Sequence, residues 1–377
     1  MLIRAEDIPL IALGGAFLAT GGGGDTLLGE IIAEDKVRAV GTVRLEPLDR
    51  FTKDDLIVAI GGVGSPTIMQ EKPMNGHEAV WALEALEAVL GKRASGVIAF
   101  EAGGMNALVP FEVAADRCLP VVDADGMGRA FPELQMESFS IYGVSATPMA
   151  MAAELGDCMV VTSARSPKLA ETLVRHFSVA AGSGQCISAE HVMDGETAQR
   201  VAIPGTISLC RDIGILIDHH GTDVDGFLTA LSARLRDTHY GKVVKIAAGK
   251  ITDLSREVRG GYDFATIALT PHTVVGDFAA SKGEAITIMV KNEYLLAHQA
   301  GVPLATTPDL ICLLDSETGR PITAETLRYG QRVAMVAIGA PALMRTQKAL
   351  PVVCPRAFGF DHDYCAIEAL YPDDMAQ

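Results

Sequence analysis

The sequence is poor in aromatic residues, in paired cysteines and in positive charge, and each shortage excludes a class of protein. Phe, Trp and Tyr supply only 5% of the 377 residues, so the core must consist mainly of Ala, Val, Ile, Leu and Met. The seven cysteines are scattered, odd in number and without a Cys-x-x-Cys pair. This pattern argues against a disulfide framework or a zinc ribbon, and we expect most cysteines to be small buried hydrophobic residues.

Acidic residues outnumber basic ones, with 47 Asp and Glu against 31 Lys and Arg and a formal net charge of −16. Such a charge repels phosphate backbones and no basic stripe is present, so we expect no nucleic-acid partner. The charge-free run 8–24 is rich in glycine and short for a membrane span. Glu6 and Asp7 lie where a signal peptide avoids acids. These features predict a cytoplasmic protein with no membrane partner, and the many small apolar residues suggest a homo-oligomer.

The length predicts two domains with an ample core. The expected fold class is α/β plus α+β, because residues 1–164 read as an α/β domain with a largely parallel sheet and residues 165–377 as an α+β domain. Within the second domain we expect helices over 165–240, a β-rich part over 242–340, and a tail that packs back onto the first domain.

Some finer elements follow from local patterns. We expect a helix and then a strand over 145–163, and three short strands joined by a Gly260-Gly261 turn from about residue 242 onward. Ser166 followed by Pro167 predicts the start of a helix, because a capping hydroxyl and a proline at the first helical position both favour it. Residues 206–220 and 225–238 read as two further helices.

Four glycines, Gly21 to Gly24, lie between two predicted N-terminal helices and are followed by Asp25. Such a run exposes backbone N–H groups and permits positive φ at a helix N-terminus, so it predicts a site for an anion or a polar ring. Gly22, Gly23, Gly24 and Asp25 are therefore candidate substrate-binding residues. No Walker or dinucleotide motif is present, and a simple hinge between the two helices is the alternative.

Further polar loops follow buried strands in the first 135 residues. Residues 61–67, 101–106 and 123–129 each come directly after an apolar strand. A β–α–β order implies a parallel sheet whose carboxyl edges meet at one crevice, where open α/β folds bind their ligands. The candidate substrate-binding residues in these loops are Gly103, Gly104, Asn106 and Arg129.

Three carboxylates at this edge are the candidate catalytic residues: Glu101, Asp123 and Asp125. Carboxylates at neighbouring strand ends can divide the roles of acid and base if their surroundings separate their pKa values. The alternative for each is a capping group that fixes a loop or a helix end.

Histidine and cysteine chemistry stays open at this point. His219 and His220 end a predicted helix, where interaction with the helix C-terminus is the simpler explanation than a metal site. The acids and histidines offer metal-ligand types without a diagnostic spacing, so the presence of a divalent metal is undecided. A covalent route through Cys354 or Cys186 matches no nucleophile signature.

Several of these motifs together resemble one known family. They are Thr20-GGGGD-Thr26, the Glu101–Asn106 segment EAGGMN, the segment VVDADGMGRAFPELQM and, near the C-terminus, PRAFGFD. This set resembles the S-methyl thiohydantoin desulfurase family, formerly catalogued as domain of unknown function 917, over nearly the whole chain. The resemblance implies two domains, a role in hydantoin metabolism, and a small-molecule substrate. It also implies a hydrolase that replaces a methylthio group with oxygen, giving a hydantoin and methanethiol.

The reaction needs a base that activates water and fixed donors that stabilise the adduct. The three carboxylates named above are candidates for the base, and the glycine N–H groups, Asn106 and Arg129 are candidates for the donors. Two other functions stay open. One is a non-catalytic subunit that binds such a ligand beside a hydantoinase-type enzyme, and the other is an ATP-dependent protein whose glycine loops bind phosphate.

Overall fold

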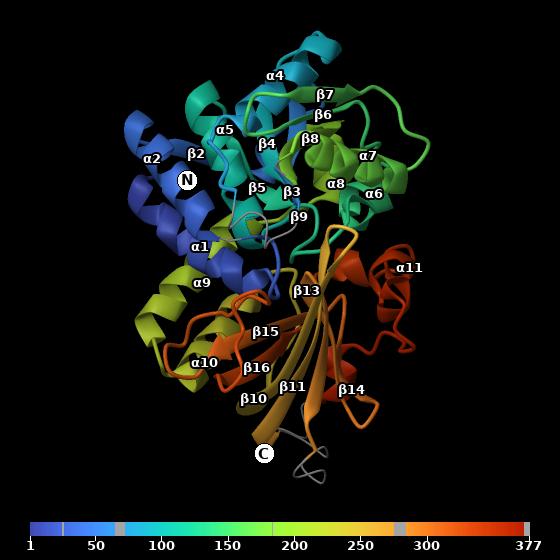
Figure 1. Cartoon of the computed structure of the whole chain (residues 1–377). Coiled ribbons are helices and arrows are strands. Elements are labelled where there is room, and N and C mark those ends of the chain that lie inside the picture. Colours follow the sequence, from blue (N-terminus) through green and yellow to red (C-terminus); the bar gives the residue numbers. More distant parts are fainter. Residues whose placement is uncertain (25, 65–71, 183, 275–283, 373–377) are drawn as a thin grey trace.

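The structure, a computed structural model, describes residues 1–24, 26–64, 72–182, 184–274 and 284–372. Within these residues nine strands form one sheet and seven strands form a second, and the two sheets lie one above the other in Figure 1. Helices surround the upper, nine-stranded sheet, whereas the lower sheet is antiparallel throughout. This confirms the expected mixed architecture of an α/β and an α+β part.

The larger sheet has the strand order β1-β2-β5-β4-β3-β8-β6-β7, and β9 pairs with β5. The pairs among β2, β5, β4 and β3 are parallel and the other pairs are antiparallel, so the predicted parallel arrangement is confined to the centre of the sheet. The strands are β1 (Leu2–Ile3), β2 (Val43–Pro47), β3 (Leu56–Gly64), β4 (Gly96–Ala99), β5 (Val121–Asp125), β6 (Met149–Ala152), β7 (Cys158–Val161), β8 (Gln185–Asp194) and β9 (Ile203–Pro204).

Two of these strands, β8 and β9, come from the part of the chain that the sequence assigns to the second domain. β8 pairs with β3 and β6 near the middle of the larger sheet. The larger sheet therefore contains strands from both sides of the predicted domain boundary between residues 164 and 165, and that boundary stays a prediction.

Side chains of the central strands alternate between two buried faces. Ile60 of β3 joins an apolar cluster that includes residues of α1, α4, α5 and α9, whereas Ala59 joins a cluster that includes residues of α7 and α8. Since strand residues alternate with a period of two, β5 directs Asp123 and Asp125 to the same face as Val121, which belongs to the α9 side.

The helices largely follow the sequence pattern. Ser166 caps α7 as predicted, because its Oγ accepts a hydrogen bond from the Leu169 backbone N–H (3.2 Å). None of the helices in the described parts of the chain is both long and apolar enough to cross a membrane. The helices are α1 (Ile8–Leu18), α2 (Thr26–Val40), α4 (Glu78–Leu90), α5 (Val109–Arg117), α6 (Ser138–Ile141), α7 (Pro167–Ala180), α8 (Gly195–Val201), α9 (Thr206–His220), α10 (Val224–Leu235), α11 (Leu350–Val353) and α12 (Ile367–Leu370).

The smaller sheet has the order β14-β13-β12-β11-β10-β16-β15 and encloses an apolar cluster of its own. The first residues of β13 reach the turn after α1, because the Tyr294 backbone N–H donates to the Thr20 carbonyl (2.7 Å). The strands are β10 (Val243–Arg259), β11 (Tyr262–Val274), β12 (Ile286–Lys291), β13 (Glu293–Gln299), β14 (Val302–Thr306), β15 (Leu310–Asp315) and β16 (Arg332–Ile338).

Two expectations about local structure are wrong. Residues 145–163 contain the expected strand, β7, but the expected helix is replaced by the strand β6, with which β7 forms a hairpin. β6 is buried on both faces, and a short apolar run of this kind does not reveal its period. The three short strands expected from about residue 242 are two long ones, β10 and β11, which pair across a turn at Gly260 and Gly261.

Candidate functional site

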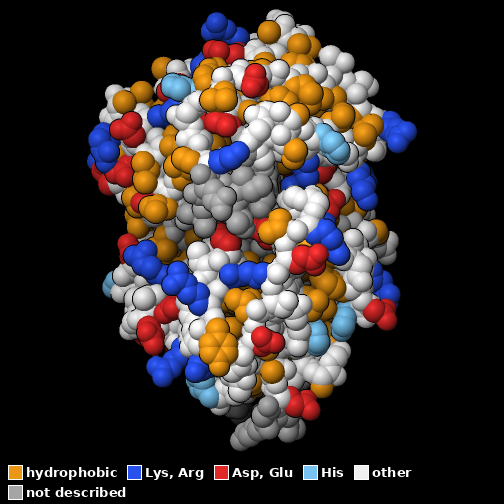
Figure 2. Space-filling view, viewed as in Figure 1, with side chains coloured by type: hydrophobic (Ala, Val, Ile, Leu, Met, Phe, Trp, Pro, Cys, Tyr) orange, Lys and Arg blue, Asp and Glu red, His pale blue; other side chains and the backbone are white. Residues whose placement is uncertain are grey.

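A pocket lies where the two sheets meet, and residues of both sheets line it. All four polar and glycine-rich segments of the first 135 residues reach it, and the start of β13 closes it from the smaller sheet. Figure 2 shows acidic side chains at this junction. The lining residues include Gly23, Gly24, Glu101, Asn106, Glu133, Glu137, Glu171, Arg175, Glu190 and Glu293.

Two glycine turns pack backbone against backbone beside the pocket. Gly23 (φ +74°) and Gly104 (φ +61°) both have left-handed conformations, which residues with a Cβ adopt at a cost. A Cβ at Gly104 would lie 2.3 Å from the Gly23 carbonyl oxygen. The Met105 backbone N–H donates to that same oxygen (2.8 Å). The tetraglycine run is therefore needed for close packing, whatever it binds.

Glu101 lies in the pocket with both carboxylate oxygens hydrogen-bonded. Asn106 Nδ2 donates to Oε1 (2.7 Å) and the Phe131 backbone N–H donates to Oε2 (3.0 Å). Asn106 is itself fixed, because its Oδ1 accepts from the Gly62 N–H (2.6 Å). Burial outweighs these bonds and raises the pKa of Glu101 to about 8. A carboxylate tuned to this range can exchange a proton near neutral pH.

The pocket is strongly acidic. Six glutamates line it, and Arg175 is the one cation among the described lining residues. Arg175 pairs with Glu171 and donates to the carbonyls of Pro132 (2.8 Å) and Gly261 (3.1 Å). Burial raises the pKa of Glu171, and it raises that of Glu293 well above the usual range. The pocket therefore favours neutral or cationic ligands and disfavours phosphate.

Asp125 does not line the pocket. Its Oδ2 accepts three backbone N–H groups, from Ala102 (2.8 Å), Met127 (3.0 Å) and Gly128 (2.7 Å). Burial nevertheless raises the pKa of Asp125 to about 6. The carboxylate thus joins the loop after β4 to the loop after β5. Its predicted catalytic role stays a prediction, and its contacts favour a positioning role.

Asp123 points to α9. Its Oδ1 accepts from the Ser208 backbone N–H in the first turn of that helix (2.9 Å), an arrangement typical of a capping carboxylate. It does not line the pocket, and its catalytic role also stays a prediction.

Arg129 is fully buried between the two sheets, and its five N–H donors are all used. Nε donates to the backbone carbonyl of Ala130, and Nη1 donates to the backbone carbonyls of Pro308 (3.3 Å) and Asp309 (2.8 Å). Nη2 donates to the Thr20 hydroxyl (2.6 Å) and to the Tyr294 carbonyl (3.0 Å). A guanidinium has no further donors. Arg129 therefore joins the two halves of the molecule, and its contacts leave no donor for the predicted binding of substrate.

The other predicted residues divide into those at the pocket and those away from it. Gly23 and Gly24 line the pocket, whereas Gly22 packs against Glu293, and Gly103 packs against Ala19 and Ala130. Asp25 lies outside the described residues.

The candidate histidines and cysteines are not among the described residues that line the pocket. His219 and His220 end α9, and His220 Nδ1 lies 3.9 Å from an Asp223 oxygen. Burial raises the pKa of the Cys186 thiol, which disfavours the thiolate that a nucleophile needs. Cys354 is half-buried at the end of α11 and does not line the pocket.

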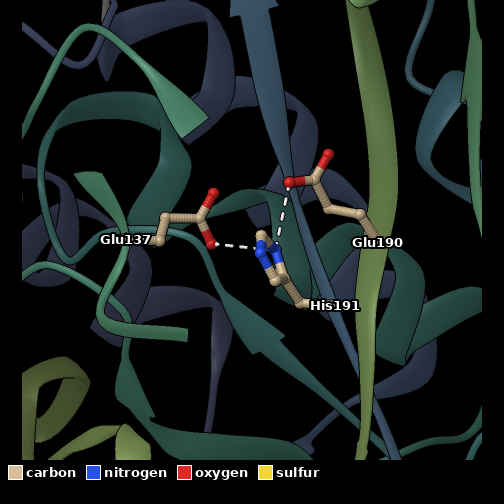
Figure 3. A group of neighbouring side chains, drawn as sticks. All are labelled: Glu137, Glu190 and His191. Carbon is tan, nitrogen blue, oxygen red and sulfur yellow. Dashed lines mark ion pairs between the residues drawn. The ribbon is translucent and has the colours of Figure 1, made fainter. Parts of the chain in front are cut away.

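Sequence reasoning missed a cluster of three side chains at the inner wall of the pocket: Glu137, Glu190 and His191. His191 Nδ1 lies 3.4 Å from Glu137 Oε2 and 3.2 Å from Glu190 Oε1, and Figure 3 shows both carboxylates directed at the imidazole ring. Burial, and then the neighbouring Glu190 carboxylate, raise the pKa of Glu137 well above its usual range. The available signal was an adjacent acid and histidine within the otherwise apolar run CISAEHVM.

Two family models together match nearly the whole chain. The S-Me-THD-like N-terminal domain matches residues 6–163 and the S-Me-THD-like C-terminal domain matches residues 165–367. The chain belongs to the S-Me-THD-like family. This confirms the resemblance to the S-methyl thiohydantoin desulfurase family, whose name implies an enzyme of the desulfurase type.

Comparison with solved structures supports the fold of this S-Me-THD-like protein. A crystal structure of a protein from Chromobacterium violaceum, determined by a structural genomics consortium, is similar with a TM-score of 0.79 and 23% sequence identity. The match covers 97% of this chain and 100% of that one. At this identity the similarity shows the fold alone. A search of curated proteins gave no significant match.

Proposed function

We propose that the protein is a hydrolase of a small five-membered heterocycle, which replaces the methylthio group of an S-methyl thiohydantoin-like substrate with oxygen from water. Membership of the S-Me-THD-like family supports the reaction class. The single observation that supports the site is Glu101, the one predicted catalytic carboxylate that lines the pocket.

In the proposed reaction, water attacks the ring carbon that carries sulfur. Glu101 accepts a proton from the attacking water, the new C–O bond forms, and the C–S bond then breaks to release methanethiolate. As the C–O bond forms, the electron pair of the C=N π bond moves to the ring nitrogen, which takes up the second proton of the water. Glu101 returns the first proton to methanethiolate as the C=O bond forms, so the products are the hydantoin and methanethiol. Because methanethiolate is a weak base, the demand for a general acid is small.

The surrounding residues have positioning roles in this proposal. Asn106 holds Glu101 through one oxygen and is fixed by Gly62 on its other side. Backbone N–H groups of the tetraglycine run are candidates for donors to the adduct, since Gly23 and Gly24 line the pocket. A neutral, flat ring suits the pocket better than a phosphorylated ligand, because six glutamates surround it.

The test compares Glu101→Gln with Glu112→Gln. Glu112 is also a buried glutamate whose pKa burial raises to about 8, but it lies in α5 and does not line the pocket. Methanethiol and hydantoin formation from a panel of S-methyl thiohydantoins are measured by chromatography. We expect Glu101→Gln to reduce kcat by roughly 100-fold or more, and Glu112→Gln to retain activity. Because the base must be ionised, kcat/KM of the wild type should rise with pH towards a plateau above about 8.

Equal activity of the Glu101→Gln and wild-type proteins would contradict this role of Glu101. Tight binding of the heterocycle without turnover, by every preparation of the wild type, would favour the alternative of an accessory subunit.

A further inference from the structure

The cluster Glu137–Glu190–His191 has the composition and the spacing of a metal site. The three ligand atoms lie within 4.8 Å of one another, and all three residues are buried. Each of the facing atoms, Glu137 Oε2, Glu190 Oε1 and His191 Nδ1, lacks a hydrogen-bond partner. Buried polar atoms without partners are rare and costly in native proteins. We infer that these residues bind one divalent transition-metal ion at the inner wall of the pocket.

The distances agree with this inference. Metal bonds to imidazole nitrogen and carboxylate oxygen are about 2.1 Å long, so neighbouring ligand atoms of a tetrahedral ion lie about 3.4 Å apart. The separations of 3.2 and 3.4 Å from His191 Nδ1 to the two oxygens match that spacing. The third separation, between the two carboxylate oxygens, lies within 4.8 Å.

An irregularity in the backbone of β8 places the side chains of the adjacent residues Glu190 and His191 on the same face of the sheet. In a regular strand, Glu190 and His191 would point to opposite faces. The pairing of β8 with β3 is irregular at this point. Ile57 pairs with Met193, but Ala59, two residues further along β3, pairs with Glu190, which is three residues away from Met193 in β8. Two residues of β8 therefore oppose Val58 alone, which is a β-bulge, and the bulge directs the His191 ring to the same face as Glu190.

His191 carries the strain of this bulge. Its φ is +44°, a left-handed conformation that residues with a Cβ rarely adopt. Glycine would adopt it freely. Strained backbone at a non-glycine residue is concentrated at functional sites, and here it places the imidazole beside the two carboxylates, with its ring near that of Phe139 (5.6 Å).

Outer contacts orient two of the three ligands. Ser140 Oγ lies 2.8 Å from His191 Nε2, and Ser188 Oγ donates to Glu190 Oε2 (2.7 Å). When Nε2–H donates to Ser140, Nδ1 presents its lone pair to the two carboxylates. Hydrogen bonds of this kind to the far side of each ligand are characteristic of metal centres.

The site is open on one side, because Glu137 and Glu190 also line the pocket. Three protein ligands with one position left for water or substrate are typical of catalytic metal sites and not of structural ones. One nitrogen and two oxygens suit Zn²⁺ or Mn²⁺. A divalent ion would also reduce the excess of negative charge in the pocket. The competing explanation is that protons shared among the three groups, without any ion, offset their repulsion.

The test uses the full chain after treatment with a chelator. The protein is titrated with Zn²⁺ in competition with a chromophoric chelator, and with Co²⁺ while the visible absorbance is recorded. We expect one equivalent of Zn²⁺ to bind the wild type, and Glu190→Gln to weaken binding by roughly 100-fold or more. Glu112→Gln, the matched buried control, should bind as the wild type does. Ser140→Ala and Ser188→Ala should each weaken binding by about 10-fold, and circular dichroism verifies that every variant is folded.

Failure of the wild type to bind Zn²⁺ or Co²⁺ stoichiometrically would overturn the inference, as would equal binding by wild type and Glu190→Gln. If Glu190→Gln does not fold, the two serine variants decide the matter, because they leave all three ligands in place. Metal binding is measured without substrate, so this result is independent of the desulfurase proposal.

Discussion

The acids of β5, Asp123 and Asp125, and the acids beside His191, Glu137 and Glu190, are all near the larger sheet, but their oxygens have different partners. One oxygen of Asp125 accepts three backbone N–H groups, and Asp123 accepts one at the start of α9. Glu137 and Glu190 each direct an oxygen at His191 that has no hydrogen-bond partner. Single unpartnered oxygens also occur elsewhere, at Asp125 Oδ1 and at Glu112 Oε1. What distinguishes Glu137 and Glu190 is that their two unpartnered oxygens converge on one imidazole nitrogen.

The largest effect is expected from Asp125→Ala. It leaves three N–H groups without their acceptor, so the free energy of unfolding should fall by roughly 3–5 kcal/mol. Urea denaturation of the two proteins measures it. Asp125→Asn keeps an acceptor oxygen and should lose less. Unchanged stability together with lost turnover would reverse the assignment and make Asp125 a catalytic group.

The second prediction concerns a buried carboxylate that has an unpartnered oxygen but is not one of the proposed metal ligands. Glu112 in α5 also has an unpartnered oxygen, and burial raises its pKa to about 8 from 4.5. Between these pH values the folded state holds a proton that the unfolded state has lost, so the contribution to stability falls as pH rises. Glu112→Gln should remove this penalty and be more stable than the wild type by roughly 4 kcal/mol at pH 8, with little difference below pH 4.5. Urea denaturation at several pH values measures the difference, and a constant difference would contradict the assignment.

The third effect has the opposite sign to that of Asp125→Ala. In chelator-treated protein, Glu137→Gln should raise the free energy of unfolding by about 1 kcal/mol, because an amide relieves the burial of a carboxylate beside Glu190. Added Zn²⁺ should stabilise the wild type and reverse the order of the two proteins. Thermal melting with and without Zn²⁺ measures both. A Glu137→Gln protein that is less stable in chelator would mean that the cluster is satisfied without an ion.

The smallest effect is expected from Asp123→Ala. One hydrogen bond at the start of α9 is lost, so unfolding should become easier by about 0.5–1 kcal/mol, with turnover within a few-fold of the wild type. Denaturation and steady-state kinetics on the same preparation measure both quantities. Turnover abolished at nearly full stability would restore Asp123 as a candidate base.

The sequence predicted much of the fold because local chemistry determines most of it. The cap at Ser166, the helices over 206–220 and 225–238 and the parallel order of the central strands all follow from short patterns. The hairpin β6–β7 did not, because an apolar run of four residues suits a strand or a helix equally well. For the site, the glycine and acid loops identified the edge of the sheet at which the pocket lies. They could not distinguish Asp125, which faces backbone donors, from Glu101, which lines the pocket.

By itself, the sequence determined the family, the two-part architecture and the edge of the sheet at which the pocket lies, because periodicity, turn residues and motif spacing are local. Only the tertiary structure decided which carboxylates are satisfied and which are not. That depends on what each oxygen meets across the fold: Ser208 for Asp123, the loops after β4 and β5 for Asp125, and a bulged histidine for Glu190. Hydrogen-bond satisfaction is a property of the folded neighbourhood, which residue order alone does not contain.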